Sequence, residues 1–227
     1  KTKDRFRFKT GETGREFEAK TVLLATGLRD RFPSLSGLAE CLGQTIYVCP
    51  DCDGYETKNR PTVVLGSGNA GANMALVLTY WTDRIVYINH EEKQISEEKQ
   101  AALAEHRIQT VTGPISKMEQ TDGRLHAVIM QNGERIEAER GFVAFGGNEV
   151  QSGLAEQLHV ERMENGHVPT DPRTKMTNVK NVWAAGDLGV HSEQATIAMG
   201  EGAQSAIWMH KTLLKMEQEA KQPASIV

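Results

Sequence analysis

The chain alternates between two kinds of hydrophobic periodicity, one typical of strands and one typical of helices. Apolar and polar residues alternate over 5–9, which predicts a strand, and the apolar run at 21–25 predicts a buried strand. A second apolar run at 62–65 is followed by apolar residues at helical spacing over 71–81 and by an apolar segment at 84–88. This order predicts a βαβ unit in the first half of the chain.

The rest of the chain, from residue 95 onward, is predicted to continue the mixture of strands and helices. It contains a helix at 95–105, a long helix at 193–215 and a polar tail from Met216 that we expect to be frayed. Apolar patterns predict further strands at 108–112, 115–119, 125–130, 134–138, 142–145 and 179–185. The sequence therefore indicates an α/β protein.

Composition narrows the class of protein. The 227 residues are 25% charged and 39% hydrophobic, as in ordinary globular proteins of one or two domains. A net charge of −4 without any block of Lys and Arg argues against nucleic-acid binding and against an acidic membrane surface. No apolar run approaches the ~20 residues that span a bilayer, and the N-terminus lacks a signal core. We expect a cytoplasmic protein, and a fragment, because the chain begins without Met inside a predicted hairpin.

The glycine motif Gly66-Ser67-Gly68-Asn69-Ala70-Gly71 lies between the strand and the helix of the βαβ unit. In a dinucleotide-binding fold these glycines permit a tight turn, approach of the pyrophosphate and close helix packing. Phosphates would lie at the helix N-terminus, where free N–H groups favour anions. The alternative is a glycine-rich turn without a ligand.

An acidic residue is expected about 20 residues after such a loop, where it binds the ribose 2′-hydroxyl. Glu91 and Glu92 lie 20 and 21 positions after Gly71. A carboxylate there repels a 2′-phosphate, which favours NADH over NADPH. A solvated acidic turn is the alternative.

Two of the three cysteines form the motif Cys49-Pro50-Asp51-Cys52-Asp53-Gly54. Thiols at this spacing can close an exchangeable disulfide, and a C-x-x-C pair in a cytosolic chain is more often catalytic or metal-binding than structural. A structural zinc site needs a second ligand pair, which neither Cys41 nor the histidines supply at the right spacing. Asp53 could move protons beside the thiols if burial raises its pKa, or its side chain could cap the loop.

A last motif, Trp183-Ala184-Ala185-Gly186-Asp187, predicts a strand that ends in a carboxylate. Ligands of α/β proteins bind at the carboxyl ends of the strands, so Asp187 is a candidate binding residue. Gly-Asp by itself is also a common turn.

In this order the motifs resemble those of the low-molecular-weight thioredoxin reductases and their relatives. The matches are Ala25-Thr26-Gly27, the cysteine motif, the glycine loop just after it, and Ala184 to Asp187 followed by Gln194-Ala195. The resemblance implies two Rossmann-like dinucleotide-binding domains of the three-layer ββα type. An NAD(P)-binding domain at 34–145 would be inserted into an FAD domain made of 1–33 and 146–227.

The resemblance also implies a mechanism and a role for each motif. Thr26, Gly27, Gly186 and Asp187 would contact FAD, and Gln194 and Ala195 would approach its isoalloxazine ring. Cys52 would face the flavin, Cys49 would attack the substrate disulfide, and Asp53 would be the acid–base residue. Electrons would pass from NAD(P)H through FAD to the cysteines and on to a thioredoxin-like protein or a small disulfide. The family usually works as a homodimer.

Two features depart from the family pattern. The first FAD-binding segment, with its own glycine motif, does not precede Lys1, and His90-Glu91-Glu92 stands where NADPH-dependent relatives carry His-Arg-Arg. Losing two guanidinium groups supports NADH as the electron donor, and the alternative is that nicotinamide binding is weak or lost. Two other functions stay open: an FAD-dependent dithiol oxidase that uses oxygen, and a non-catalytic nucleotide-binding fragment.

Overall fold

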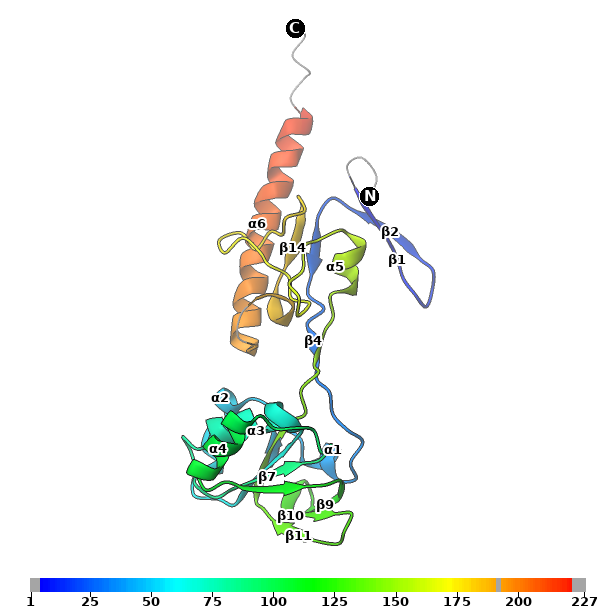
Figure 1. Cartoon of the computed structure of the whole chain (residues 1–227). Helices are drawn as coiled ribbons and strands as arrows, with labels where there is room; N and C mark the ends of the chain where they lie inside the picture. The colour runs from blue at the N-terminus through cyan, green and yellow to red at the C-terminus, as the bar shows by residue number, and fades with distance from the viewer. Residues whose placement is uncertain (1–4, 191–192, 222–227) are drawn as a thin grey trace. The chain divides into compact units, whose positions relative to one another are not determined.

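The computed structural model describes residues 5–190 and 193–221 and divides into two compact units. The discontinuous unit comprises Lys1–Asp30 and Asn148–Val227, and the inserted unit comprises Arg31–Gly147. The sequence predicts domain limits at 33/34 and 145/146, and the units divide three residues earlier and two residues later. Figure 1 shows the chain crossing from one unit to the other twice.

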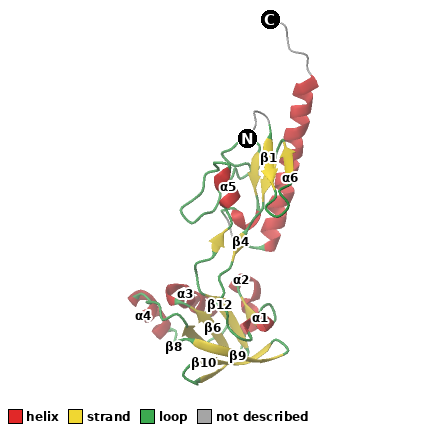
Figure 2. Ribbon diagram, turned by 90° about the vertical axis from the view of Figure 1, so that its right-hand side faces the viewer, coloured by secondary structure: helices red, strands yellow, loops and turns green. Residues whose placement is uncertain are grey.

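The inserted unit is built on a parallel sheet of five strands in the order β5-β12-β6-β7-β8. One face carries two helices and the other a three-stranded antiparallel sheet, as Figures 1 and 2 show. The parallel strands are β5 (Ile46–Tyr47), β6 (Thr62–Gly66), β7 (Ile85–Asn89), β8 (Gln109–Thr112) and β12 (Arg140–Ala144). The other elements are α3 (Gly68–Leu78), α4 (Glu97–Glu105), β9 (Ile115–Thr121), β10 (Arg124–Met130) and β11 (Arg135–Glu137).

Strand alternation explains why this sheet is buried on both faces. All five residues of β6 are buried, and successive side chains point to opposite faces. Val63 and Leu65 pack in the cluster shared with the antiparallel sheet, whereas Val64 packs with residues of α3 and α4. The result is a Rossmann-like three-layer unit, which confirms the predicted α/β class.

The discontinuous unit contains a parallel pair of strands, β3 (Val22–Leu24) and β14 (Val182–Ala184). Val22 and Leu24 of β3 and Val182 and Ala184 of β14 share one cluster with buried residues that include Phe6, Val168 and Leu188. Around it lie β1 (Phe6–Lys9) paired with β2 (Glu16–Ala19), β4 (Leu28–Arg29) paired with β13 (Glu149–Val150), α5 (Gly153–Gln157), a 3-10 turn η2 (Gly186–Leu188) and α6 (Ala195–Lys221).

Several elements differ from the sequence prediction. Helix α6 continues to Lys221, so the tail predicted to fray from Met216 is helical through that residue. Its Lys, Glu, Gln and Ala residues are good helix formers, which a mainly polar composition does not reveal. The structure also adds short elements that are too brief for periodicity to detect: α1 (Leu38–Cys41), β5, α2 (Pro50–Asp53) and the 3-10 turn η1 (Gly54–Thr57).

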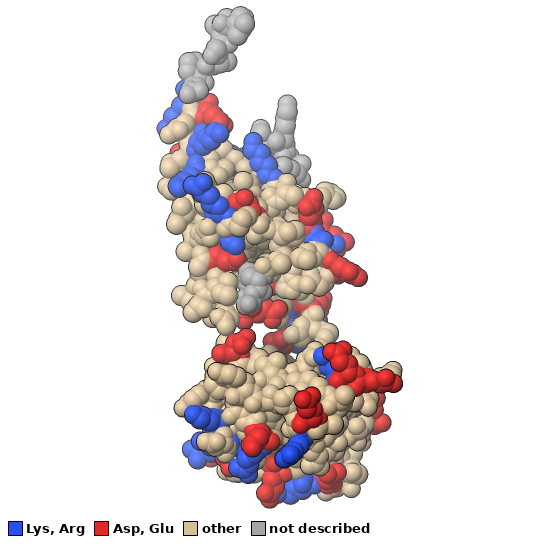
Figure 3. Space-filling view, turned by 60° about the vertical axis from the view of Figure 1, so that its left-hand side comes forward, with Lys and Arg blue, Asp and Glu red and all other residues tan. Residues whose placement is uncertain are grey.

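Surface charge and helix hydropathy bear on possible partners. On the lower body in Figure 3, which is the inserted unit, basic and acidic side chains lie among one another. Among the described residues, no helix is both long and apolar enough to cross a bilayer.

Close packing of α3 on β7 depends on Gly71. A Cβ atom at this position would lie 2.3 Å from Cε2 of Tyr87, whose side chain is fully buried. The Tyr87 hydroxyl donates a hydrogen bond to the Gly68 carbonyl at 2.7 Å, so burial and this hydrogen bond both hold the ring in place. Gly71 therefore sets the distance between the helix and the sheet.

We expect Gly71→Ala to lower the free energy of unfolding of the inserted unit by about 1–3 kcal/mol, the usual cost of overpacking a core. Asn73→Ala is the matched control, since Asn73 lies on the same helix and is exposed. It should change the free energy by no more than about 0.5 kcal/mol. Urea unfolding followed by circular dichroism measures both, and equal midpoints for the two variants would contradict the packing role of Gly71.

Candidate functional site

The glycine loop leaves β6 and begins α3 at the carboxyl edge of the parallel sheet. The Ser67 N–H donates to the Ala144 carbonyl at 3.2 Å, and the Gly68 N–H donates to Oδ1 of Asn89 at 2.9 Å. The Asn69 side chain accepts a hydrogen bond from the Ser96 N–H at 2.9 Å. The hydroxyl of Ser67 is buried and makes no hydrogen bond of standard geometry with a described residue, although it lies near enough to the Glu91 carboxylate to help lower the pKa of Glu91. The loop is therefore held by its neighbours and keeps one unpartnered polar group.

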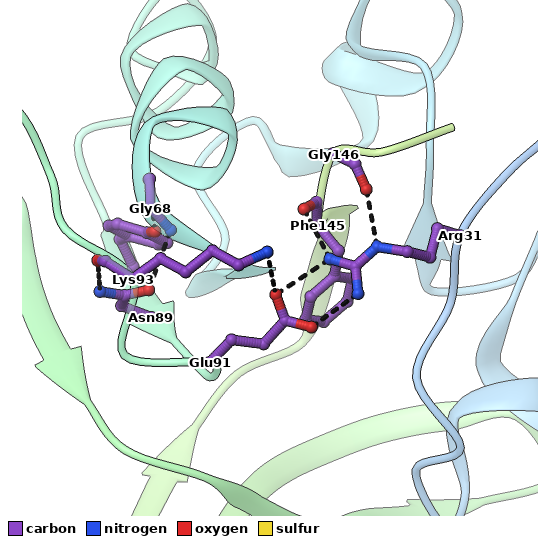
Figure 4. A network of polar contacts seen from close by, with 8 residues as sticks. Arg31, Gly68, Asn89, Glu91, Lys93, Phe145 and Gly146 are labelled. Carbon is purple, nitrogen blue, oxygen red and sulfur yellow. Dashed lines mark hydrogen bonds and ion pairs between the residues drawn. The ribbon is translucent and has the colours of Figure 1, made fainter. Parts of the chain in front are cut away.

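The strand after the loop, β7, ends at Asn89 rather than at a carboxylate. Besides holding Gly68, Asn89 donates from Nδ2 to the Lys93 carbonyl at 2.8 Å, as Figure 4 shows. His90 accepts a hydrogen bond from the Ile115 N–H at Nδ1, and burial lowers its pKa. The sequence prediction missed Asn89 because it considered acidic residues only. The available signal was the place of Asn89 at the end of a strand beside a glycine loop.

Glu91 lies in the turn just after β7 and is bound by two cations. Its Oε1 accepts from Nη1 of Arg31 at 2.6 Å, and its Oε2 accepts from Nη2 of Arg31 at 2.9 Å and from Nζ of Lys93 at 2.9 Å. Hydrogen bonds from Arg31, and then from Lys93, hold the pKa of Glu91 well below its usual range, with a smaller contribution from the nearby Ser67 hydroxyl. Glu92 is exposed. Of the two predicted carboxylates, Glu91 is therefore the one that is held by ion pairs at the end of β7.

Arg31 comes from the first crossing between the units, 60 residues before Glu91. Its Nε donates to the Gly146 carbonyl and its Nη2 to the Phe145 carbonyl, both at 2.8 Å. No local pattern in the sequence signals this contact, since Arg31 and Glu91 belong to different motifs. Figure 4 shows the guanidinium between the carboxylate and these two carbonyls.

The cysteine motif forms a one-turn helix, α2, that follows β5. Cys49 is the residue before its first turn, and the two Sγ atoms lie 2.8 Å apart. The hydrogen bond with Cys49, and then burial, raise the pKa of Cys52 to about 11. Both sulfurs are free thiols, with Cys49 half-buried and Cys52 exposed. The pair thus has the separation from which a disulfide can close.

Asp53 and Gly54 complete the cysteine motif. Burial, and then the charge of Glu56, raise the pKa of Asp53. Its side chain makes no hydrogen bond to any described residue, so it does not form the loop cap that was the alternative to a proton-transfer role. Gly54 is buried against Trp81, since a Cβ at this glycine would lie 2.3 Å from the indole Nε1. This contact fixes the motif against the residue that follows α3 by three positions.

The parallel sheet brings the cysteines and the glycine loop to one edge. Strand β12 pairs in parallel with β5 on one side and with β6 on the other. Cys49 follows β5 and Gly66 ends β6, so both leave the sheet at its carboxyl edge, about 10 Å apart across two strand spacings. Ligands of open α/β sheets bind at this edge. By contrast, no cluster of three metal-ligating side chains occurs among the described residues.

In the discontinuous unit, β14 leads into the turn that carries Gly186 and Asp187. The Gly186 N–H donates to Oε2 of Glu201 at 3.1 Å, and Oε1 of Glu201 binds Nζ of Lys175 at 2.7 Å in a largely buried ion pair. Oδ1 of Asp187 is buried without a hydrogen-bond partner among the described residues. An unpartnered buried carboxylate oxygen fits a ligand that donates a hydrogen bond, such as a ribityl hydroxyl.

The remaining predicted FAD contacts also lie in the discontinuous unit. Thr26 donates from its hydroxyl to the Gln151 carbonyl, and the Gln151 N–H donates to the Gly27 carbonyl at 2.8 Å. Gln194 precedes the first residue of α6, Ala195, and its carbonyl accepts from the Ala198 N–H. Thr26 and Gly27 thus join the segment after β3 to Gln151, which follows β13. Gln194 and Ala195 lie at the start of α6.

Asp30 is a further carboxylate that the motifs did not predict. Burial, and then the charge of Asp187, raise its pKa, and Oδ1 of Asp30 accepts from Nδ2 of Asn148 at 2.8 Å. Two carboxylates therefore lie near each other at the candidate flavin turn.

The chain is similar in sequence to thioredoxin reductases and to alkyl hydroperoxide reductase components. Thioredoxin reductases of Peptoclostridium litorale and Yarrowia lipolytica are 26% and 30% identical to 92% and 88% of this chain, which covers 69% and 65% of their lengths. An alkyl hydroperoxide reductase component of Pseudomonas putida is 29% identical over 86% of this chain, which covers 38% of that protein. The chain thus spans about two thirds of the thioredoxin reductases that it matches and a smaller share of the hydroperoxide reductase component.

Solved structures agree with the fold. The crystal structure of HlmI superimposes with a TM-score of 0.84 at 27% identity, covering 95% of this chain and 67% of HlmI. A thioredoxin reductase TrxB from Bacillus anthracis superimposes with a TM-score of 0.80 at 25% identity, covering 96% of this chain and 72% of its own. The sequence profile of the pyridine nucleotide-disulphide oxidoreductases matches residues 1–202, and this chain belongs to that family.

Proposed function

We propose that the protein is an NADH-dependent flavoprotein disulfide oxidoreductase whose redox pair is Cys49 and Cys52. One observation carries the proposal: two free thiols 2.8 Å apart leave the same sheet edge as a dinucleotide-type glycine loop. Ligands of open α/β sheets bind at this edge, so the redox pair lies in the unit that would hold the electron donor. The names of the similar proteins support the same class of chemistry.

The glycine loop would hold the dinucleotide pyrophosphate against the first turn of α3. Free N–H groups at a helix start favour anions, and the buried hydroxyl of Ser67 is available as a further donor. Glu91 would accept a hydrogen bond from the adenosine ribose, which supports NADH as the electron donor. His90 is held neutral by its buried environment and adds no positive charge for a 2′-phosphate.

FAD would contact the turn at Gly186 and Asp187, the strand end at Thr26 and Gly27, and the start of α6 at Gln194 and Ala195. When bound, FAD would supply two-electron transfer between the nicotinamide and the cysteine pair. The unpartnered Oδ1 of Asp187 supports this assignment because it is a buried acceptor that needs a donor. Lys175 and Glu201 act on the same turn by holding the Gly186 N–H.

The cysteines would reduce substrate by thiol–disulfide exchange. The Cys49 thiolate attacks one sulfur of the substrate disulfide, which breaks the S–S bond and gives a mixed disulfide. Cys52 then attacks Cys49, which forms the Cys49–Cys52 disulfide and releases a substrate dithiol. The high pKa of Cys52 keeps it protonated beside Cys49 at neutral pH, which supports Cys49 as the first nucleophile.

Asp53 would exchange the protons of this reaction. The pKa of its carboxyl is raised by burial and by Glu56, and an acid–base residue works best when its pKa lies nearer to ambient pH. The carboxyl makes no hydrogen bond to a described residue and is therefore available to a thiol.

The remaining features of the proposal concern partners and setting. The substrate would be a thioredoxin-like protein, as the names of the similar reductases suggest, or a small-molecule disulfide. We further propose a homodimer in the cytoplasm, where a free C-x-x-C pair stays reduced between turnovers.

We expect alkylation of Cys52 by iodoacetamide to be slow at about pH 8 and to rise with pH toward its pKa of about 11, because only the thiolate reacts. Cys49→Ala removes the hydrogen bond that contributes most to that pKa. The variant should therefore alkylate Cys52 about tenfold faster at about pH 8. Peptide mass spectrometry measures the rate, and buried Cys41 is the internal control that stays unreactive in both proteins. Equal Cys52 rates in the two proteins would refute the coupling.

With FAD bound, Cys52→Ser should abolish reduction of oxidised thioredoxin and leave reduction of the flavin by NADH intact, because the pair loses its resolving thiol. Stopped-flow absorbance separates the two steps. Cys41→Ala, which alters the third and buried thiol, should keep both. Unchanged disulfide turnover in Cys52→Ser would rule out the proposed route.

A further inference from the structure

Arg31 is the most extensively bonded side chain at the candidate ribose position. It meets both carboxylate oxygens of Glu91 at 2.6 and 2.9 Å and two backbone carbonyls, of Phe145 and Gly146, at 2.8 Å each. Its Cζ also lies 5.9 Å from the centre of the Phe145 ring. The guanidinium is planar and rigid, so these contacts fix the direction of the Glu91 carboxylate, as Figure 4 shows.

The acceptor capacity of Glu91 is nearly used up. A carboxylate offers about four lone-pair sites, two on each oxygen. Arg31 takes one site on each oxygen and Lys93 takes a second site on Oε2. An adenosine ribose presents two neighbouring hydroxyls, so it can bind Glu91 through both only by displacing one of these cations.

The cations also reverse the local charge. Arg31 and Lys93 each carry one positive charge against the single negative charge of Glu91, and the Glu91 side chain is only 24% exposed. The isolated sequence motif, by contrast, places a bare carboxylate at this position. A phosphate that approaches the trio of Arg31, Lys93 and Glu91 meets two cations and one anion. The two cations weaken the repulsion that a bare carboxylate would exert.

We propose that Arg31 is a specificity-determining residue of the dinucleotide site, which weakens the preference for NADH by occupying Glu91. The inference rests on the proposed function, because it requires that this edge binds the adenosine ribose. In the native chain Arg31 competes with the ribose hydroxyls and compensates the charge that excludes a 2′-phosphate. Without Arg31, Glu91 accepts from the ribose and repels the phosphate.

The test measures binding to the 227-residue chain by calorimetry, with ADP-ribose and its 2′-phosphorylated derivative as probes. Neither probe carries a hydride, so the measurement needs no flavin and no turnover. Arg31→Met should bind ADP-ribose about tenfold more tightly, roughly the value of one charge-assisted hydrogen bond. It should bind the 2′-phosphate about tenfold more weakly, because a cation is lost and a carboxylate is exposed.

Arg29→Met is the matched control. Arg29 lies two residues earlier and forms an exposed ion pair with Glu149, so its loss should leave the ratio of the two affinities unchanged. In the Glu91→Gln background, Arg31→Met should no longer favour ADP-ribose, since the competition for the carboxylate is gone. A double-mutant cycle of the native chain, the two single variants at positions 31 and 91 and the double variant isolates the coupling.

Two negative outcomes are distinguishable. If both probes bind but their ratio is the same in Arg31→Met and the native chain, the role of Arg31 is overturned and the dinucleotide site stands. If neither probe binds the native chain or any variant, the proposed dinucleotide site is wrong, and the role of Arg31 is overturned with it. Should Arg31→Met unfold, Arg31→Lys keeps the charge but loses the two-pronged contact, and its ratio should shift in the same direction by less. An unshifted ratio in a folded Arg31→Lys would also count against the proposal.

Discussion

Parallel pairing of β12 with β5 on one side and β6 on the other is the constraint on which the candidate site depends. Parallel strands end at the same edge, so the segments that follow β5 and β6 must emerge together. One of these segments carries Cys49 and the other carries the glycine loop. The cysteine motif and the glycine loop therefore lie at the same edge of the sheet, because β12 pairs in parallel with the strands that precede them. Two contacts then fix the edge, Gly71 against Tyr87 and Gly54 against Trp81.

Electrostatics at the end of β7 decides how this edge would treat its ligand. Considered alone, Glu91 favours a ribose with free hydroxyls over one with a 2′-phosphate. Paired with Arg31 and Lys93, it is part of a trio with one net positive charge. The same carboxylate therefore carries different consequences for cofactor choice depending on a residue 60 positions away. Charge counted along a motif is a poor guide where a crossing segment supplies the counter-ion.

In the discontinuous unit, a buried ion pair fixes the turn that carries the candidate flavin contact. Its turn at Gly186 and Asp187 is braced by the buried pair of Lys175 and Glu201, which holds a backbone N–H and leaves the carboxylate of Asp187 unpartnered on one oxygen. Buried charges are costly unless paired, so a brace of this kind argues that the geometry of the turn matters. The proposed contact of FAD with the unpartnered oxygen of Asp187 would give this geometry a use.

Periodicity and motifs by themselves determined the α/β class and the βαβ unit. They also identified the thiol pair of Cys49 and Cys52 and the dinucleotide-type loop from Gly66 to Gly71. These are local features, because a strand, a glycine turn and a thiol pair each depend on a few adjacent residues. Short elements such as β5 and α2 were missed, since two to four residues cannot show a period. Only the tertiary structure decided that Asn89 binds the Gly68 N–H, that Arg31 binds Glu91 and that Lys175 and Glu201 brace the turn at Gly186. Each of these contacts joins residues from separate segments, and which segments meet depends on strand order and chain crossings, which no local pattern encodes.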